Sequence, residues 1–176
     1  MNPFFTIGHS NRDFGAFAAL LQQSRIDHLV DVRTVPRSRS NPQFNADAMP
    51  NALESIGISY EHLAALGGLR GKSKTVNADE NAFWENASFH NYADYAMSSD
   101  FEQGLRQLIE CGRHRRCAIM CAEAVWWRCH RRIVADHLLA RGFEVMHIMG
   151  AGRVEAAQLT RSAVVEDDGR VRYPAE

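Results

Sequence analysis

The sequence predicts one three-layer α/β/α domain of the Rossmann-like kind, with a mainly parallel sheet of about five strands. Two observations support this fold class. Short apolar runs such as FFTIG and RCAIMC suit strands that are buried on both faces of a parallel sheet. These runs alternate with segments whose apolar residues recur at the helical period. A length of 176 residues suits a single domain with its own core.

Strands and helices are expected to alternate through the first half of the chain. FFTIG at residues 4–8 is a strand that ends at Gly8. The elements that follow are a helix with Phe14, Phe17, Leu20 and Leu21 on its apolar face, a strand at 28–32, a loop at 34–43, a helix capped by Asn45 or Asp47 that ends at Ile56, and a strand at 58–63.

The second half continues the alternation. A polar loop leads into a helical region from about Phe83 to Glu110, which the serines and aspartate at 98–100 divide because these residues cap helices well. A strand at 116–121, a helix at 130–140 and a strand at 143–148 follow. We expect residues 1–150 to form the α/β domain. Residues 151–176 are expected to form an extension packed on that domain, with a small hairpin around Asp168-Gly169.

The composition argues against several classes of protein. A net charge of −1 does not favour general attraction to polyanions. There is no run of about 18 apolar residues, so no membrane-spanning helix is expected. The first residues lack a basic segment followed by an apolar one, so we expect no signal peptide and a cytoplasmic location. Four cysteines in such a chain do not indicate a disulfide framework.

Arginine dominates the positive charge, since only Lys72 and Lys74 of the 20 basic residues are lysines. A genome rich in G and C explains the number of arginines better than it explains their clustering. Forked guanidinium groups suit the recognition of phosphate or carboxylate. The clusters are Arg33, Arg37 and Arg39; Arg70, Lys72 and Lys74; and Arg128, Arg131 and Arg132.

Unusual polar residues recur where each predicted strand ends. In open α/β sheets, ligands bind outside the carboxyl ends of the strands, so these residues are expected to share one site. Along the chain they are His9 and Ser10, Asp31 and Arg33, the GGLRGKSK loop, Cys121 and Glu123, and His147. Their placement predicts a ligand site along this edge of the sheet.

Two segments at this edge leave alternatives open. TIGHS either cradles an anion through His9 or Ser10 and the amides of a helix N-terminus, or is a tight turn capped by Ser10. Asp31 and Arg33 lie on the same side of a strand, and a buried carboxylate needs a partner. We expect Asp31 to be paired structurally, and Arg33 and Arg37 to contact the ligand.

The segment after the third strand is also open to two interpretations. Gly67, Gly68 and Arg70 belong to a flexible basic loop that either closes over a substrate as a lid or is a solvated loop. Tyr92 and Tyr95, at helical spacing, are expected in the core rather than as stacking platforms for bases.

The segment MCAEAVWWRCHRR offers three chemistries. Cys121 and Cys129 with His130 have no C-x-x-C pair and match no common zinc module, which disfavours a metal site. An activated thiolate usually shows C-x5-R spacing, whereas Cys121 and Arg128 are separated by six residues. Glu123 suits acid–base chemistry, with protons handled together with His9 or His130. Arg128 and Arg131 are then expected to bind an anion.

With these motifs assembled, the chain resembles the prokaryotic family known as domain of unknown function 488, DUF488. The resemblance runs from about Phe5 to His147, and the KSKTVNADENAF segment departs from it. It rests on TIGHS, LVDVRTVPRS, GISYEHLAALGGLRG, the helix with Phe101, IMCAE, CHR and EVMHI. The resemblance implies the α/β fold and the same site edge, and it implies no reaction.

The sequence therefore favours an enzyme that acts on a phosphate-bearing ligand, of nucleotide or nucleic-acid origin, in an Arg-lined cleft. Acid–base chemistry by a carboxylate and a histidine is favoured over a thiolate nucleophile. One alternative is a non-catalytic module that binds nucleic acid through the basic loops. A second alternative is a cysteine- or metal-dependent redox or sulfur-transfer protein. The sequence identifies no cofactor and indicates no membrane partner.

Overall fold

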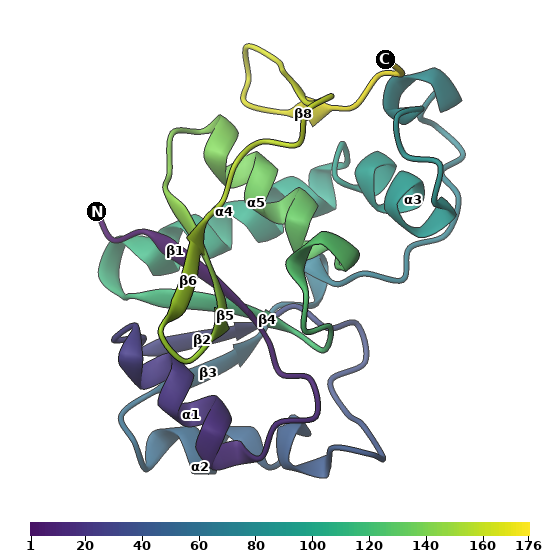
Figure 1. The fold of residues 1–176 in the computed structure, drawn as a ribbon. Helices are drawn as coiled ribbons and strands as arrows, with labels where there is room; N and C mark the ends of the chain where they lie inside the picture. Colours follow the sequence, from purple (N-terminus) through teal and green to yellow (C-terminus); the bar gives the residue numbers. More distant parts are fainter.

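The computed structural model describes all of residues 1–176. The protein is built on a six-stranded sheet (Figure 1). The strand order is β3-β2-β4-β1-β5-β6, and every pair is parallel except β5 with β6. The strands are β1 (Phe4–Gly8), β2 (His28–Asp31), β3 (Ser59–His62), β4 (Cys117–Cys121), β5 (Val145–Gly150) and β6 (Arg153–Ala156). The predicted fold class is confirmed, with one antiparallel edge strand added.

Helices cover both faces of this sheet. In Figure 1, α1 and α2 lie below the sheet and α4 and α5 lie above it. The helices are α1 (Phe14–Gln23), α2 (Met49–Glu54), α3 (Ala87–Tyr95), α4 (Ser99–His114) and α5 (Arg131–Ala140). Single 3-10 turns occur at Pro42–Phe44, Ala64–Leu66, Ala78–Asn81 and Trp126–Arg128. None of the helices is both long and apolar enough to cross a membrane.

The two cores explain why the central strands read as continuous apolar runs. All five residues of β1 and of β4 are buried. Successive side chains of a strand point to opposite faces, so Ile119 packs under α4 and α5 while Ala118 and Met120 pack against α1 and α2. A strand buried on both faces therefore favours apolar residues at most positions, and the buried Thr6 of β1 is hydrogen-bonded to His147.

Capping side chains set the start of two helices, one of them predicted from the sequence. Asp13 accepts a hydrogen bond from the amide of Ala16 and begins α1, and Ser98 accepts one from Phe101 and begins α4. The predicted break near residues 98–100 is therefore confirmed. The predicted cap of α2 is wrong, because α2 begins at Met49 without a side-chain cap, and Asn45 accepts a bond from the Ser38 amide instead.

The C-terminal segment is tied to the rest of the molecule at two places. Strand β6 pairs with β5, so the sheet continues past residue 150. Strands β7 (Val164–Val165) and β8 (Val171–Arg172) form the predicted small hairpin. The buried Tyr173 then donates a hydrogen bond of 2.7 Å to Asp136 on α5.

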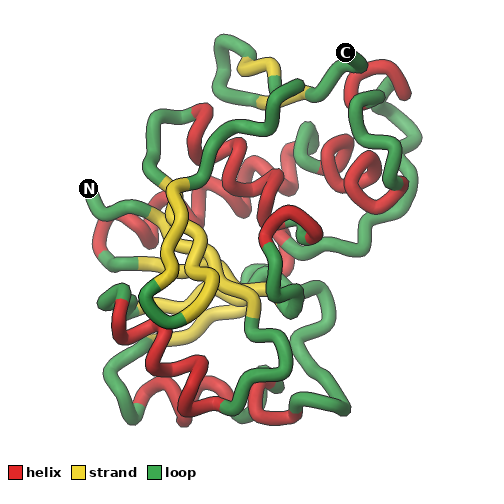
Figure 2. The backbone as a smooth tube through the Cα atoms, viewed as in Figure 1, coloured by secondary structure: helices red, strands yellow, loops and turns green.

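The carboxyl ends of the parallel strands all open toward one edge of the sheet. Loops, drawn in green in Figure 2, leave that edge at the right of the view. They include the segments that follow β2, β3 and β4. The fold thus gathers at one edge the loops in which the sequence placed its candidate residues.

Candidate functional site

A pocket of about 530 Å³ lies at this edge, between the ends of β1, β2 and β4. Its size is typical of a site for a small molecule. Most of the predicted site residues line it: His9, Ser10, Arg33, Arg37, Gly68, Cys121, Glu123, Arg128, Cys129 and His130. Gly67, Arg70 and Arg131 do not. Thr34, Ser38, Asn41, Ser88, Phe89 and Tyr92 also line it, and the sequence did not assign them to the site.

Arg33 forms the predicted pair with Asp31. Its Nε and Nη2 donate to the two carboxylate oxygens of Asp31 at 2.9 and 2.7 Å, and Nη2 also donates to the Phe44 carbonyl. Burial opposes the charge on Arg33, yet the hydrogen bonds and negative charge of Asp31 raise its pKa. Because these bonds occupy most of the guanidinium, Arg33 forms part of the pocket wall and is not the free anion clamp that we expected.

His9 is also held by its neighbours. Nδ1 lies 2.7 Å from the Ser10 carbonyl oxygen, and Nε2 lies 3.3 Å from Nη1 of Arg33. The ring stacks on Phe44 with the centroids 4.5 Å apart. Burial lowers the pKa of His9, so the ring is neutral at pH 7. With both ring nitrogens engaged, His9 has no free position for the proton transfer expected from the sequence.

Two cysteines meet at the buried end of the pocket. The sulfur atoms of Cys121 and Cys129 lie 2.7 Å apart, and both thiols are free. Cys121 ends β4, and Cys129 lies just before the first turn of α5. The 3-10 turn Trp126–Arg128 brings the chain back to the end of β4. The structure thus places this pair in the site, whereas the sequence favoured Glu123 and the histidines.

Arg131 lies behind the cysteines and is fully buried. Its Nη1 donates to Sγ of Cys121 at 2.5 Å and to the Glu123 carbonyl at 2.7 Å, and its Nε donates to Oγ1 of Thr6 at 3.2 Å. No carboxylate pairs with it. The expectation that Arg131 binds the ligand's anion is therefore wrong, since its charge faces the cysteine pair instead.

The thiol pair is electrostatically asymmetric. Burial opposes ionisation of Cys129, but a hydrogen bond from Cys121 and the charge and amide of Arg131 lower its pKa to about 7. Burial raises the pKa of Cys121 well above its usual value, and the hydrogen bond with Cys129 adds to this. The pair thus shares one proton near neutral pH, with the proton on Cys121 and the negative charge on Cys129.

His130 is oriented toward this thiolate. Its Nε2 donates to the Val32 carbonyl at 2.9 Å, which leaves Nδ1 without a proton and 3.6 Å from Sγ of Cys129. Burial lowers the pKa of His130 and keeps the ring neutral. When Cys129 is protonated, its S–H can donate to this unprotonated Nδ1. His130 is thus the one predicted catalytic histidine with a free acceptor atom.

The Gly67-Gly68 pair provides close packing, not a mobile lid. A Cβ on Gly67 would lie 2.6 Å from Oγ1 of Thr34, and one on Gly68 would lie 2.9 Å from Nδ1 of His130. Arg70 folds away from the pocket, with its guanidinium 3.8 Å from the ring centroid of Tyr95. It also donates hydrogen bonds to the carbonyls of Gly67 and Ala64. The predicted roles of Arg70 in anion binding and of this loop as a lid are not supported by these contacts.

Three exposed charged side chains remain at the rim. Arg37, Glu123 and Arg128 line the pocket, and their charged groups make no hydrogen bond or ion pair within the protein. The backbone beside Glu123 is fixed, because a Cβ on Gly8 would lie 1.7 Å from the Glu123 carbonyl oxygen. Ser10, also in the lining, has a left-handed backbone with φ of 53°, a conformation that is found often at functional sites. The rim thus offers two free cations and one free carboxylate to a ligand.

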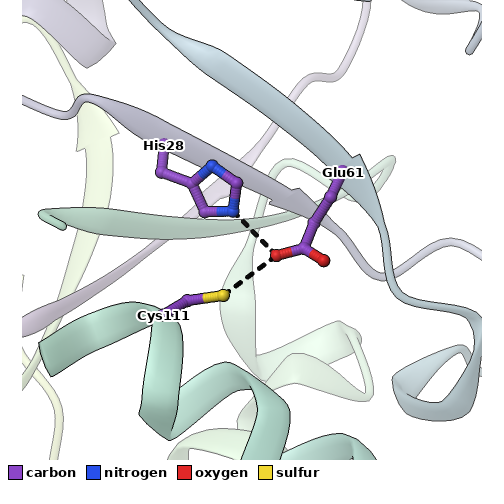
Figure 3. Close-up of side chains that lie close together, drawn as sticks. All are labelled: His28, Glu61 and Cys111. Carbon is purple, nitrogen blue, oxygen red and sulfur yellow. Dashed lines mark hydrogen bonds and ion pairs between the residues drawn. The ribbon is translucent and has the colours of Figure 1, made fainter. Parts of the chain in front are cut away.

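A second polar cluster lies under α4, away from the pocket (Figure 3). Glu61 Oε1 accepts from Nε2 of His28 at 2.8 Å and from Sγ of Cys111 at 3.1 Å. These three residues are close enough to hold a metal ion. However, burial and the hydrogen bond to Glu61 raise the pKa of Cys111 to about 11. In addition, the guanidinium of Arg115 lies 3.2 Å from Nδ1 of His28.

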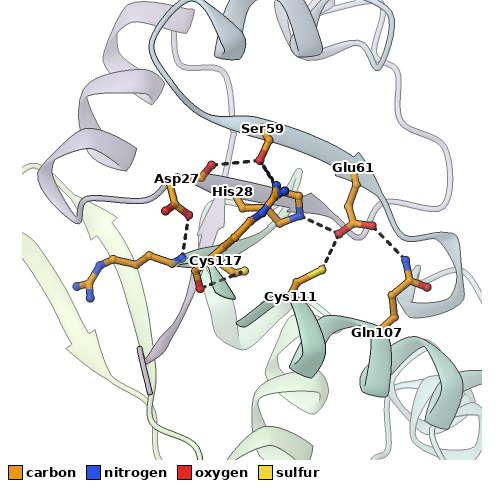
Figure 4. Close-up of polar contacts among 9 residues, drawn as sticks. Asp27, His28, Ser59, Glu61, Gln107, Cys111 and Cys117 are labelled. Carbon is orange, nitrogen blue, oxygen red and sulfur yellow. Dashed lines mark hydrogen bonds and ion pairs between the residues drawn. The ribbon is translucent and has the colours of Figure 1, made fainter. Parts of the chain in front are cut away.

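Neighbouring side chains form further hydrogen bonds with Glu61 and His28 of this cluster. Gln107 donates to the second oxygen of Glu61, and Ser59 bonds His28 (Figure 4). A protonated thiol and a neighbouring cation fit a cation site poorly. The cluster is therefore a hydrogen-bonded connection between β2, β3 and α4.

A model of the family described as "Domain of unknown function DUF488" matches residues 13–138. The matched region includes the cysteine pair, Arg33 and His130, and it begins after His9 and Ser10. No match was found among curated proteins or among solved structures.

Proposed function

The chain belongs to the DUF488 family, whose description names no activity, and we propose from its pocket that it is an enzyme acting on a small phosphate-bearing ligand. The ligand class is a nucleotide or a component of nucleic acid. The observation that carries the proposal is the pair of rim arginines, Arg37 and Arg128, which have no acidic partner and share one pocket. Unpaired guanidinium groups beside a concave surface suit phosphate recognition.

The rest of the lining suits such a ligand. Ser10, Ser38 and Asn41 offer polar groups near the arginines. Phe89 and the exposed Leu69, also in the lining, offer apolar surface on which a base or ribose could pack. The cavity of about 530 Å³ is large enough for a mononucleotide and too small for a folded nucleic acid.

The groups available for chemistry lie at two depths. At the buried end, Cys129 can act as a thiolate nucleophile, with Nδ1 of His130 3.6 Å from its sulfur. At the rim, the free carboxylate of Glu123 can exchange protons with a bound ligand. The contacts of Cys129 and His130 therefore favour thiol chemistry at the centre of the reaction, with Glu123 in a supporting role.

Ligand binding by single-arginine variants tests the proposal. Calorimetric titration with AMP, ribose 5-phosphate and inorganic phosphate should detect binding by the wild type. Arg37→Ala and Arg128→Ala should each weaken it about 10-fold or more, because a hydrogen bond to a charged group contributes about 1.5–3 kcal/mol. Arg153→Ala, on β6 and outside the pocket, is the matched control and should bind as the wild type does.

Two results would contradict the proposal. The first is that Arg37→Ala and Arg128→Ala bind every one of these phosphate compounds as tightly as the wild type does. The other is binding of long nucleic acid that depends on Lys72 and Lys74 and falls steeply with salt, as a nucleic-acid-binding module requires.

A further inference from the structure

The sulfur atoms of Cys121 and Cys129 lie closer together than the packing of two buried side chains requires. Their sulfur atoms lie 2.7 Å apart with no side chain between them, and a disulfide needs about 2.05 Å. The two thiols come from different elements, β4 and the start of α5, so a bond between them would join the sheet to the helix. Only a small movement separates the two free thiols from a covalent link.

The two cysteines of the pair have different neighbours, which favour different protonation states. Cys129 receives the amide N–H of Arg131 on its sulfur and lies 3.6 Å from Nδ1 of His130. Cys121 receives Nη1 of Arg131 and keeps its proton. An ionised thiol beside a protonated one is the arrangement of an attacking and a resolving cysteine.

Both cysteines line the pocket, with Cys121 3% and Cys129 6% exposed. Cys111 and Cys117 lie outside it, and burial raises the pKa values of their thiols to about 11 and about 12. The fold therefore activates one cysteine pair and leaves the other two thiols protonated at neutral pH.

We propose that Cys129 and Cys121 form a redox dithiol that reduces small anionic disulfides entering the pocket. The choice of an anionic substrate rests on the proposed function, because it uses Arg37 and Arg128. Exchange at the cysteine pair does not depend on those arginines.

The exchange proceeds in two balanced steps. The thiolate of Cys129 attacks one sulfur of the substrate R–S–S–R, which forms a mixed disulfide and releases one RS⁻. The sulfur of Cys121 then attacks Sγ of Cys129, which forms the internal disulfide and releases the second RS⁻. Two electrons pass from the cysteine pair to the substrate. The proton of Cys121 and one proton from water complete the two RSH products. An external dithiol restores the reduced pair.

Peptide mapping by mass spectrometry tests the proposal on the full-length protein. Reduced wild type treated with glutathione disulfide should form the Cys121–Cys129 link. Cys121→Ser should instead trap glutathione on Cys129, and Cys129→Ser should form neither product at a comparable rate. Cys111→Ser is the matched control and should behave as the wild type does. Dithiothreitol should reverse all of these changes.

Thiol labelling of the wild type tests the same proposal without any variant, so it remains informative if a cysteine variant does not fold. Iodoacetamide should label Cys129 with a midpoint near pH 7, and at that pH about 10-fold or more faster than Cys111 or Cys117. The proposal is overturned if Cys111 or Cys117 reacts first in the wild type, or if glutathione disulfide leaves Cys121 and Cys129 unlinked.

A second disulfide separates this proposal from the proposed function. Glutathione disulfide is anionic and cystamine is cationic, so the wild type should react faster with glutathione disulfide, and Arg37→Ala should reduce that preference. Formation of the link at equal rates with both reagents would support the redox dithiol and contradict anion recognition by the rim. Failure of the link with both would overturn the redox dithiol alone.

Discussion

Replacing Cys129 by serine should destabilise the folded protein much more at pH 8.5 than at pH 6. Burial opposes ionisation of this thiol, but the hydrogen bond from Cys121 and the charge of Arg131 lower its pKa from 9.0 to about 7. A group whose pKa is lowered by folding stabilises the native state above its unfolded pKa. That contribution is lost as the pH falls through the folded pKa. Serine does not ionise in this range, so Cys129→Ser removes the contribution.

The magnitude follows from the two pKa values. A difference of about two pKa units corresponds to about 2.7 kcal/mol when it is fully expressed. At pH 8.5 about 2 kcal/mol of this is realised, and at pH 6 only about 0.1 kcal/mol. The hydrogen bond from Cys121 is the largest cause that lowers this pKa, and the charge of the buried Arg131, which no carboxylate balances, adds to it. The loss is large beside a typical total stability of about 5–15 kcal/mol.

Urea unfolding under reducing conditions at both pH values measures the effect. The quantity of interest is the difference in free energy of unfolding between wild type and variant, because the titration of other groups is common to both. Cys111→Ser is the control, since the Cys111 thiol, with a pKa of about 11, stays protonated in the folded protein at both pH values. A Cys129→Ser difference that is the same at pH 6 and pH 8.5 would refute the assignment of a thiolate to Cys129.

Three further predictions concern stability and use the same unfolding assay at pH 7. Gly8→Ala should cost about 3 kcal/mol, because its Cβ would lie 1.7 Å from the Glu123 carbonyl oxygen, whereas Gly150→Ala meets no atom within 4 Å and should change stability by less than about 0.5 kcal/mol. Equal effects would contradict the close approach at Gly8. His137→Leu should stabilise by about 1–2 kcal/mol, because both ring nitrogens are buried without a partner and the ring packs on Phe101; a loss of stability would show that the ring is satisfied in solution. Glu123→Gln should leave the free energy of unfolding within about 0.5 kcal/mol, since its carboxylate is exposed and unpaired, and a large loss would make Glu123 structural.

Buried histidines make the whole protein sensitive to acid. Burial lowers the pKa values of His137 and His147 to about 3, with smaller contributions from nearby arginines. A histidine that stays neutral in the folded state but takes up a proton in the unfolded state favours unfolding below the unfolded value of about 6.5. We therefore expect the contribution of these neutral histidines to be fully present above pH 6.5 and to be lost steadily toward pH 3, in addition to the loss due to Cys129 between about pH 9 and 7.

The edge of the sheet that carries the pocket could be predicted from sequence because strand ends are local features. Apolar runs mark the parallel strands, and in a parallel sheet their carboxyl ends must meet at one edge. His9, Arg33 and Cys121 each follow such a run, and all three line the pocket. The pairing of Asp31 with Arg33 was predictable for a similar reason, since a carboxylate within an apolar run needs a partner nearby.

The direction in which each side chain points was not predictable from the same patterns. The glycine pair Gly67-Gly68 suggests a flexible loop when only the sequence is considered. In the structure, Thr34 and His130 pack so closely against these two residues that a Cβ would clash. Strand β6 was missed because it has only four residues, all exposed, and an alternation this short does not stand out from a polar tail.

The sequence by itself determined the α/β fold, the edge at which the pocket lies and most of the residues around the pocket, because hydrophobic periodicity and strand ends are encoded locally. Only the tertiary structure decided the chemistry. Cys121 and Cys129 match no spacing rule, but the turn at Trp126–Arg128 brings their sulfurs together. Arg131 looks like an anion-binding residue until its burial directs its charge to that pair. Contact and burial depend on how distant segments pack, and it is this packing that lowers the pKa of Cys129, which local patterns do not specify.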